Sequence, residues 1–151
     1  MTECSKYAED AGVILALHNH VPVIRDYRDV LKMVREVNSP NLKVSLDVWA
    51  LNKKTPEYIQ TAARAVGNLQ VLSHYGDNIY DRDADGKVNG AEYYKHFIGA
   101  MHEIGFKGYL GYELCHPLPV ENGQTVGIEY AQKKAQEGCE FMKRMIKEAT
   151  Q

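Results

Sequence analysis

The chain has 151 residues and a formal net charge of −2 at pH 7, which fits one ordinary domain. Its composition, 44% hydrophobic and 25% charged, is typical of a globular protein and not of a disordered one. No basic cluster supports nucleic-acid binding, and no apolar stretch approaches the ~20 residues that span a bilayer. We therefore expect a single domain over residues 1–151 that binds neither nucleic acid nor membrane.

The cysteines give information about the compartment. Cys4, Cys115 and Cys139 are odd in number, widely separated and without a C-x-x-C pair. This pattern is typical of reduced thiols, and it does not suit a disulfide framework or a structural zinc site. The N-terminal residues are polar and acidic, unlike a signal peptide. From these features we predict a cytoplasmic protein.

Helical patterns alternate with short apolar runs along the whole chain. Apolar residues at helical spacing predict a first helix that ends at Gly12, and the continuous apolar run at 13–17 predicts a buried parallel strand. Thr55-Pro56 is a typical helix start, and Gly67 a typical helix end. The other predicted elements are helices over about 27–38, over 94–105 and from about 128 to near the C-terminus, and strands at 42–46, 69–73 and 109–112.

The order αβαβαβαβα predicts an α/β fold with a parallel sheet and right-handed crossovers. Four strand–helix units are half of a (β/α)₈ barrel, which usually has roughly 250 residues. A half-barrel leaves two strand edges unpaired, at 13–17 and 109–112, and exposes its inner face. We therefore expect a homo-oligomer, or else cover from the segments 75–90 or 117–127.

A residue that can bind a metal stands at the end of each predicted strand. In parallel α/β folds the carboxyl ends of the strands form the functional sites. Two imidazoles and two carboxylates suit one divalent ion, with manganese, zinc or cobalt favoured over magnesium. The predicted ligands are His18, Asp47, His74 and Glu113.

Four segments, AEDAGVILALHNH, VSLDVW, VLSHYGD and MHEIGFKGYLGYEL, together resemble the sugar phosphate isomerase/epimerase superfamily of xylose-isomerase-like TIM barrels. The resemblance spans nearly the whole chain, but only the C-terminal half of the family's barrel. It implies that the four strand-end residues occupy the family's metal-ligand positions. It also implies isomerisation or epimerisation of a small sugar, sugar phosphate or keto compound through an enediolate.

Two positions depart from the family pattern. His18 stands where the best-known epimerases carry a glutamate, and Ala50 stands where a histidine follows the ligand aspartate. Those epimerases use two glutamates to move the proton, so the resemblance leaves Glu113 as the one clear base in this half. The second acid or base would be His18, His20 or a group outside this chain, and we take Glu113 and His18 as the candidate catalytic residues. His20 and His116 are the candidate substrate-binding residues.

Two alternatives stay open. Residues 81–92 match the calcium loop of an EF-hand, although the preceding residues predict strand and loop where an EF-hand needs a helix. An exposed Asp-Gly turn leading into the next helix is the simpler interpretation. The second alternative is a non-catalytic, truncated half-barrel that binds a metal without turnover. Whether this half alone is an enzyme is therefore not decided by the sequence.

Overall fold

Four short strands lie side by side in chain order and run in the same direction. In the computed structural model, which describes residues 1–76, 79, 90–114 and 118–151, the sheet order is β1-β2-β3-β4 and every pairing is parallel. The bounds are Leu15–His18 for β1, Leu42–Ser45 for β2, Gln70–Tyr75 for β3 and Tyr109–Tyr112 for β4. The predicted α/β architecture with four parallel strands is confirmed.

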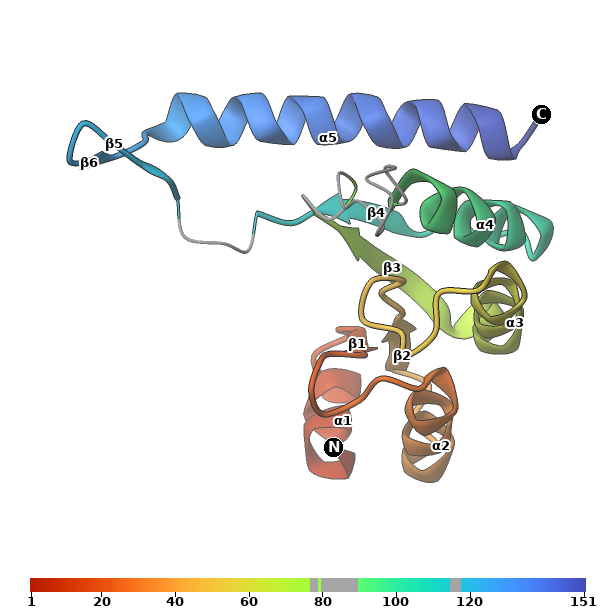
Figure 1. The fold of residues 1–151 in the computed structure, drawn as a ribbon. Coiled ribbons are helices and arrows are strands. Elements are labelled where there is room, and N and C mark those ends of the chain that lie inside the picture. The colour runs from red at the N-terminus through yellow and green to blue at the C-terminus, as the bar shows by residue number, and fades with distance from the viewer. Residues whose placement is uncertain (77–78, 80–89, 115–117) are drawn as a thin grey trace.

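Helices connect the strands and pack around the sheet (Figure 1). α2, α3 and α4 follow one another along one side of the sheet, and the long α5 lies over α4 and β4. Their bounds are Thr2–Asp10 for α1, Tyr27–Val37 for α2, Pro56–Val66 for α3, Gly90–Glu103 for α4 and Ile128–Ala149 for α5; a 3₁₀ turn, η1, covers Gly67–Leu69.

The helix ends follow local chemistry. The Thr55 hydroxyl accepts a hydrogen bond from the Tyr58 N–H over 3.4 Å, and Pro56 opens α3. Asn38 ends α2 in the left-handed conformation, with φ of 51°, and its N–H donates to the Val34 carbonyl. These caps set the chain directions that bring each following strand back into the sheet.

The core lies between the sheet and the helices. Leu42, Val44, Leu46 and Val48 alternate along β2 and beyond it, and all four are fully buried. Because side chains alternate across a strand, the residues between them face the other side. The helices close this core with residues that include Val30, Val34, Ile59, Ala62, Phe97 and Met101.

One element was absent from the sequence predictions. Val120–Glu121 (β5) and Gln124–Thr125 (β6) form an antiparallel hairpin, which lies away from the main sheet at the start of α5 (Figure 1). Asn122 and Gly123 both have positive φ, 52° and 77°, as a two-residue hairpin turn requires. The Asn-Gly pair is a known hairpin signal that could have identified it.

The two sheet edges, β1 and β4, have no strand partner on their outer sides among the described residues. Beside them, Val13 and Ile14 are each 50% exposed, and Tyr109 is 79% exposed. The sequence predicts a strand at 13–17, and the observed strand β1 begins two residues later, at Leu15. The homo-oligomer expected from these edges stays a prediction.

Several sequence predictions concern residues that lie outside the described part of the chain. Residues 81–89 of the EF-hand-like segment, Cys115 and His116 belong to this group. Glu92, the last residue of that segment, lies exposed in the first turn of α4. Cys4 and Cys139 are free thiols. Among the described helices, none is both long and apolar enough to cross a membrane.

Candidate functional site

The register of β1, β2 and β3 places three of the predicted ligands on one face of the sheet. His18 pairs with Ser45, and Ser45 also pairs with Leu72. Asp47 lies two residues beyond Ser45, and His74 lies two residues beyond Leu72. Because side chains alternate in direction, His18, Asp47 and His74 all project from the face opposite the helices.

The fourth predicted ligand follows the same rule. His74 pairs with Gly111, and Glu113 lies two residues further along. A Cβ placed on Gly111 would lie 3.6 Å from Cδ2 of His74, which shows that the two positions face the same side. The Glu113 N–H donates to the Tyr75 carbonyl over 2.8 Å and extends the pairing of β3 with β4. The Glu113 side chain is exposed at this end of the sheet.

Three histidine rings gather at the carboxyl ends of β1 and β3. The His18 and His74 rings meet edge to face with centroids 5.1 Å apart, and the His20 ring lies 5.8 Å from that of His18. His20 is exposed, and its Nδ1 contacts the Val21 carbonyl at 2.6 Å. The predicted substrate-binding roles of His20 and of His116 stay predictions.

The His18 ring is oriented by the backbone. Its Nδ1 lies 3.1 Å from the Ser45 carbonyl oxygen, which can only accept a hydrogen bond. This contact fits a proton on Nδ1, which in the neutral ring leaves the lone pair on Nε2. A histidine that binds a metal through one ring nitrogen usually donates a hydrogen bond from the other nitrogen to a carbonyl or carboxylate oxygen, which fixes the ring orientation.

The His74 ring has an unsatisfied nitrogen. Its Nδ1 is buried and has no hydrogen-bond partner among the described residues. Buried polar atoms in native proteins nearly always have one. This nitrogen is therefore a candidate contact for an ion or a polar ligand at the end of the sheet.

Asp47 lies between these rings in the sheet order and is largely buried. Burial raises the pKa of its carboxyl group above the usual 3.8, and the hydrogen bond from the Trp49 N–H, 2.8 Å long, opposes this rise. The nearby His18, Lys54 and His74 side chains also favour the charged form. A bound cation would stabilise the same form.

Two residues that the sequence did not single out hold Asp47 in place. Asn19 is fully buried, and its side chain pairs with both backbone groups of Asp47. The Lys54 ammonium donates to the carbonyls of Val48, at 3.1 Å, and Leu51, at 2.6 Å, and also to that of Trp49. Burial lowers the Lys54 pKa to about 8, and the charge of Asp47 opposes this shift. Neither role follows from a spacing in the sequence.

The donor types at this end of the sheet are those of a divalent first-row site. Imidazole nitrogens and a carboxylate are ligands that manganese, zinc and cobalt accept. Across residues 1–76, 79, 90–114 and 118–151, no three histidine, cysteine, aspartate or glutamate side chains form a group that could hold a metal ion. The four-residue metal centre therefore stays a prediction.

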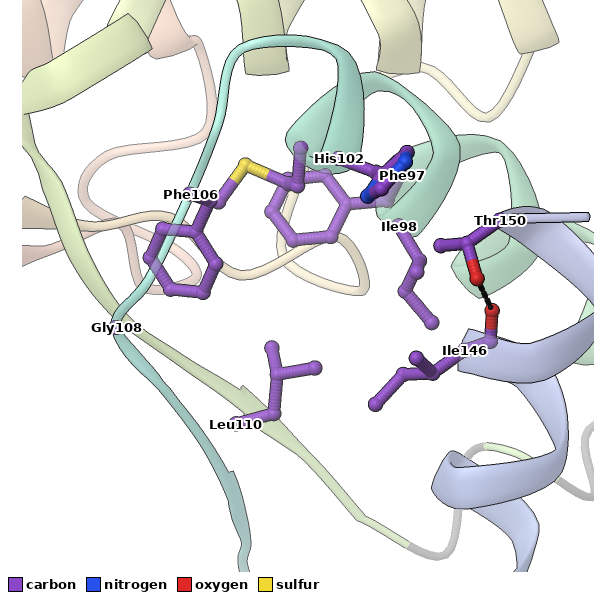
Figure 2. A pocket seen from close by; sticks show the side chains of 9 residues that line it. Phe97, Ile98, His102, Phe106, Gly108, Leu110, Ile146 and Thr150 are labelled. Atoms are coloured by element: carbon purple, nitrogen blue, oxygen red, sulfur yellow. Dashed lines mark hydrogen bonds between the residues drawn. The ribbon is translucent and has the colours of Figure 1, made fainter.

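A separate pocket lies at the other end of the sheet. It has a volume of about 200 Å³ and lies between α4, the start of β4 and the end of α5 (Figure 2). Phe97, Phe106, Leu110 and Ile146 project toward it. Gly108 lines it just before β4 begins, so the pocket is at the amino end and not at the histidine end.

Comparison with known proteins identifies the family. A family model described as "Xylose isomerase-like TIM barrel" matches residues 1–145. A search of curated proteins gave no match. A solved D-psicose 3-epimerase is 18% identical, with a TM-score of 0.72, and is aligned over 96% of this chain and 53% of its own.

Two further solved structures show the same likeness. A D-allulose 3-epimerase from Methylomonas sp. is 20% identical, with a TM-score of 0.73 over 96% of this chain and 52% of its own. An L-ribulose 3-epimerase is 16% identical, with a TM-score of 0.69 over 99% of this chain and 52% of its own. The likeness concerns the fold, and the chain spans about half the length of these structures.

The four parallel strands in chain order and the half-length coverage agree with the predicted half-barrel. The family model covers almost all of the sequence. The chain belongs to the xylose isomerase-like TIM barrel family and forms half of such a barrel.

Proposed function

We propose that this chain is a metal-dependent sugar isomerase or epimerase domain, with its site at the carboxyl ends of β1 to β4. The observation that carries the proposal is the His18–His74 ring pair, which lies on the same face as Asp47 and Glu113. The family match and the sugar epimerases among the similar structures support it.

The proposed ligands are His18, Asp47, His74 and Glu113. A divalent ion bound there would polarise vicinal oxygens of the sugar and stabilise the negative charge of an enediolate. Two observations support the imidazole ligands. His18 Nδ1 contacts the Ser45 carbonyl, which would leave Nε2 for the ion, and the buried His74 Nδ1 has no partner among the described residues. We propose manganese, zinc or cobalt and not magnesium, because magnesium prefers oxygen ligands.

Glu113 is the proposed base for the carbon-bound proton. It is a carboxylate at the end of β4, and its exposed side chain can change rotamer to reach a substrate on this face. His18 was the other candidate acid or base, but a ring that binds the ion through Nε2 and donates from Nδ1 to the Ser45 carbonyl has no nitrogen left to carry a proton, so we propose only the ligand role for it. His20 and His116 are proposed to bind sugar hydroxyl groups, since imidazoles can donate and accept hydrogen bonds.

The substrate class is a small sugar, sugar phosphate or keto compound. The similar solved structures include D-psicose, D-allulose and L-ribulose 3-epimerases. We propose a ketose of this kind as the first compound to test. The chain covers about half of those enzymes, so we further propose that it acts in an assembly, as a homo-oligomer that covers the edges of β1 and β4.

Proton exchange with solvent tests the chemistry directly. The full chain is incubated with Mn²⁺ and D-psicose in D₂O, and deuterium incorporation at carbon is followed by NMR. Glu113→Gln should lose at least about 100-fold in exchange rate, the usual contribution of a positioned acid or base. Glu121→Gln, an exposed change in the β5–β6 hairpin, is the control. Exchange at the parent rate in the Glu113 variant would remove this residue from the mechanism.

A non-catalytic half-barrel is the second candidate function. The observation that favours it is coverage of only about half of each similar structure. Such a domain would bind the metal through the same residues but would show no exchange in any variant. The D₂O experiment therefore separates the two candidates, provided that metal binding is measured on the same sample.

A further inference from the structure

Asn19 makes an unusual connection at the point where the β1–β2 pairing ends. The last paired residues are His18 and Ser45. Immediately beyond them, the Asn19 Nδ2 donates to the Asp47 carbonyl over 2.9 Å, and the Asp47 N–H donates to Asn19 Oδ1 over 2.6 Å. One side chain thus supplies both the donor and the acceptor that a neighbouring strand would normally offer.

The environment makes this connection rigid. Asn19 is 0% exposed, so water does not compete for its amide group. The connection joins residues 28 positions apart, from the end of β1 to the loop after β2. It fixes the backbone of Asp47 relative to His18, the residue directly before Asn19, whose ring is itself held by Ser45.

The Asp47 side chain is held by an independent contact. Its Oδ1 accepts the Trp49 N–H, within the turn whose carbonyls are bound by the Lys54 ammonium. Asn19 therefore controls where the Asp47 backbone stands, and the turn controls how its carboxylate is rotated. If the Asp47 carboxylate shares an ion with two imidazoles, both its backbone position and its side-chain rotation have to be fixed.

We propose that Asn19 is a positioning residue that aligns the Asp47 carboxylate with the His18–His74 pair through its two bonds to the Asp47 backbone. This rests on the proposed function, because it assigns a purpose to Asn19 only if Asp47 and the histidines bind an ion together. Both groups of the Asn19 amide are bonded to the Asp47 backbone, so Asn19 is not proposed as a ligand. Its effect passes entirely through Asp47.

Asn41 provides a matched control. Its Nδ2 also donates to two backbone carbonyls, those of Ala8 at 3.3 Å and Val13 at 2.8 Å, and it also joins distant segments of the chain. It lies at the amino end of the same strands, away from the histidines. Asn41→Ala therefore removes a comparable connection without touching the site.

The test is a double-mutant cycle in Co²⁺ affinity, measured by calorimetry on the full chain. Asn19→Ala should weaken Co²⁺ binding about tenfold or more, as removal of residues that orient metal ligands does. Asn41→Ala should leave it within about twofold. In the Asp47→Ala background, Asn19→Ala should cause no further loss, because its effect passes through Asp47. The visible spectrum of bound Co²⁺ should change in Asn19→Ala and not in Asn41→Ala.

The outcomes are distinguishable. Equal Co²⁺ affinity in Asn19→Ala and Asn41→Ala, or additive losses with Asp47→Ala, would overturn the positioning role and leave the proposed function intact. A parent chain that does not bind Co²⁺ would overturn both. If Asn19→Ala does not fold, as judged by circular dichroism, Asn19→Ser takes its place in the cycle. Its hydroxyl is too short to serve both Asp47 groups, so the same loss and the same non-additivity are expected.

Discussion

The imidazole rings of His18 and His74 meet edge to face, with centroids 5.1 Å apart and planes inclined by 61°. The two residues belong to β1 and β3, which do not pair with each other because β2 lies between them. The rings therefore reach toward one another across the end of β2, the strand that leads into Asp47. This contact joins the carboxyl ends of β1 and β3 beside the end of β2.

The burial of Asp47 predicts a stability effect that depends on pH. Its pKa is raised in the folded chain, so the folded state favours the neutral acid. The favourable contribution is complete below the unfolded pKa, about 3.9, and is lost as the pH rises through the folded pKa. At pH 7 the carboxyl group is therefore a cost to the metal-free protein.

Asp47→Asn should accordingly raise the melting temperature of the metal-free chain at pH 7. Its amide oxygen can still accept the Trp49 N–H, and the gain should vanish below about pH 4, where the aspartate is protonated as well. Thermal melts in the presence of a chelator measure both values. Asp10→Asn, an exposed change in α1, is the control and should shift neither melt much. A lower melting temperature for Asp47→Asn at pH 7 would contradict the account of Asp47.

Two glycines in neighbouring helices should respond to alanine in opposite directions. A Cβ at Gly138 in α5 would lie 2.5 Å from Cδ2 of Tyr112, whereas at Gly99 in α4 it would only approach the Ala149 carbonyl, at 3.8 Å. Gly99→Ala should stabilise the chain by about 0.5–1 kcal/mol, because alanine is the better helix former. Gly138→Ala should destabilise it, since overpacking costs about 1–3 kcal/mol.

Urea unfolding of the two variants measures this difference. The opposite signs test one structural statement, that α5 packs directly on β4 through Tyr112. If Gly138→Ala proved as stabilising as Gly99→Ala, α5 would not be seated as the structure places it.

The open edge of β4 predicts self-association. Tyr109 is 79% exposed on the inner face at this edge, next to backbone groups without a partner strand in the described sheet. A two-fold axis parallel to the strands would place β4 of one copy beside β1 of the other, running in the same direction. Tyr109→Lys should weaken that contact, because an edge lysine opposes strand pairing.

Sedimentation equilibrium measures the association of the parent chain and of the variant. Val120→Lys is the control, because it also places a lysine at an exposed apolar residue, but in the separate β5–β6 hairpin. This variant should associate like the parent. A parent chain that sediments as a well-folded monomer at all concentrations would rule out the predicted homo-oligomer.

Much of the fold could be read from local sequence patterns. The strand at 109–112 and the ends of α3 at Pro56 and Val66 were placed correctly, since caps, glycines and apolar periodicity act over a few residues. The β5–β6 hairpin was missed although Asn122-Gly123 signals it. The start of β1 was placed too early, because Val13 and Ile14 are as apolar as the strand residues but have no partner strand.

The candidate site was predictable only in part. The rule that parallel strands present functional residues at their carboxyl ends selected His18, Asp47 and His74 as candidates, and the register puts them on one face. Asn19 and Lys54 could not be found in this way. Their roles depend on backbone groups that lie unpaired where a strand ends, and those groups become visible only when distant segments are brought together.

Metal titration of the full chain tests the central claim most directly. Co²⁺ should bind with one ion per chain, and His18→Ala and His74→Ala should each weaken binding by about 100-fold or more, while His102→Ala on the exposed side of α4 should bind like the parent. Absence of Co²⁺ binding by the parent, or equal binding by all three variants, would contradict the claim that the histidines at the ends of β1 and β3 form a metal site.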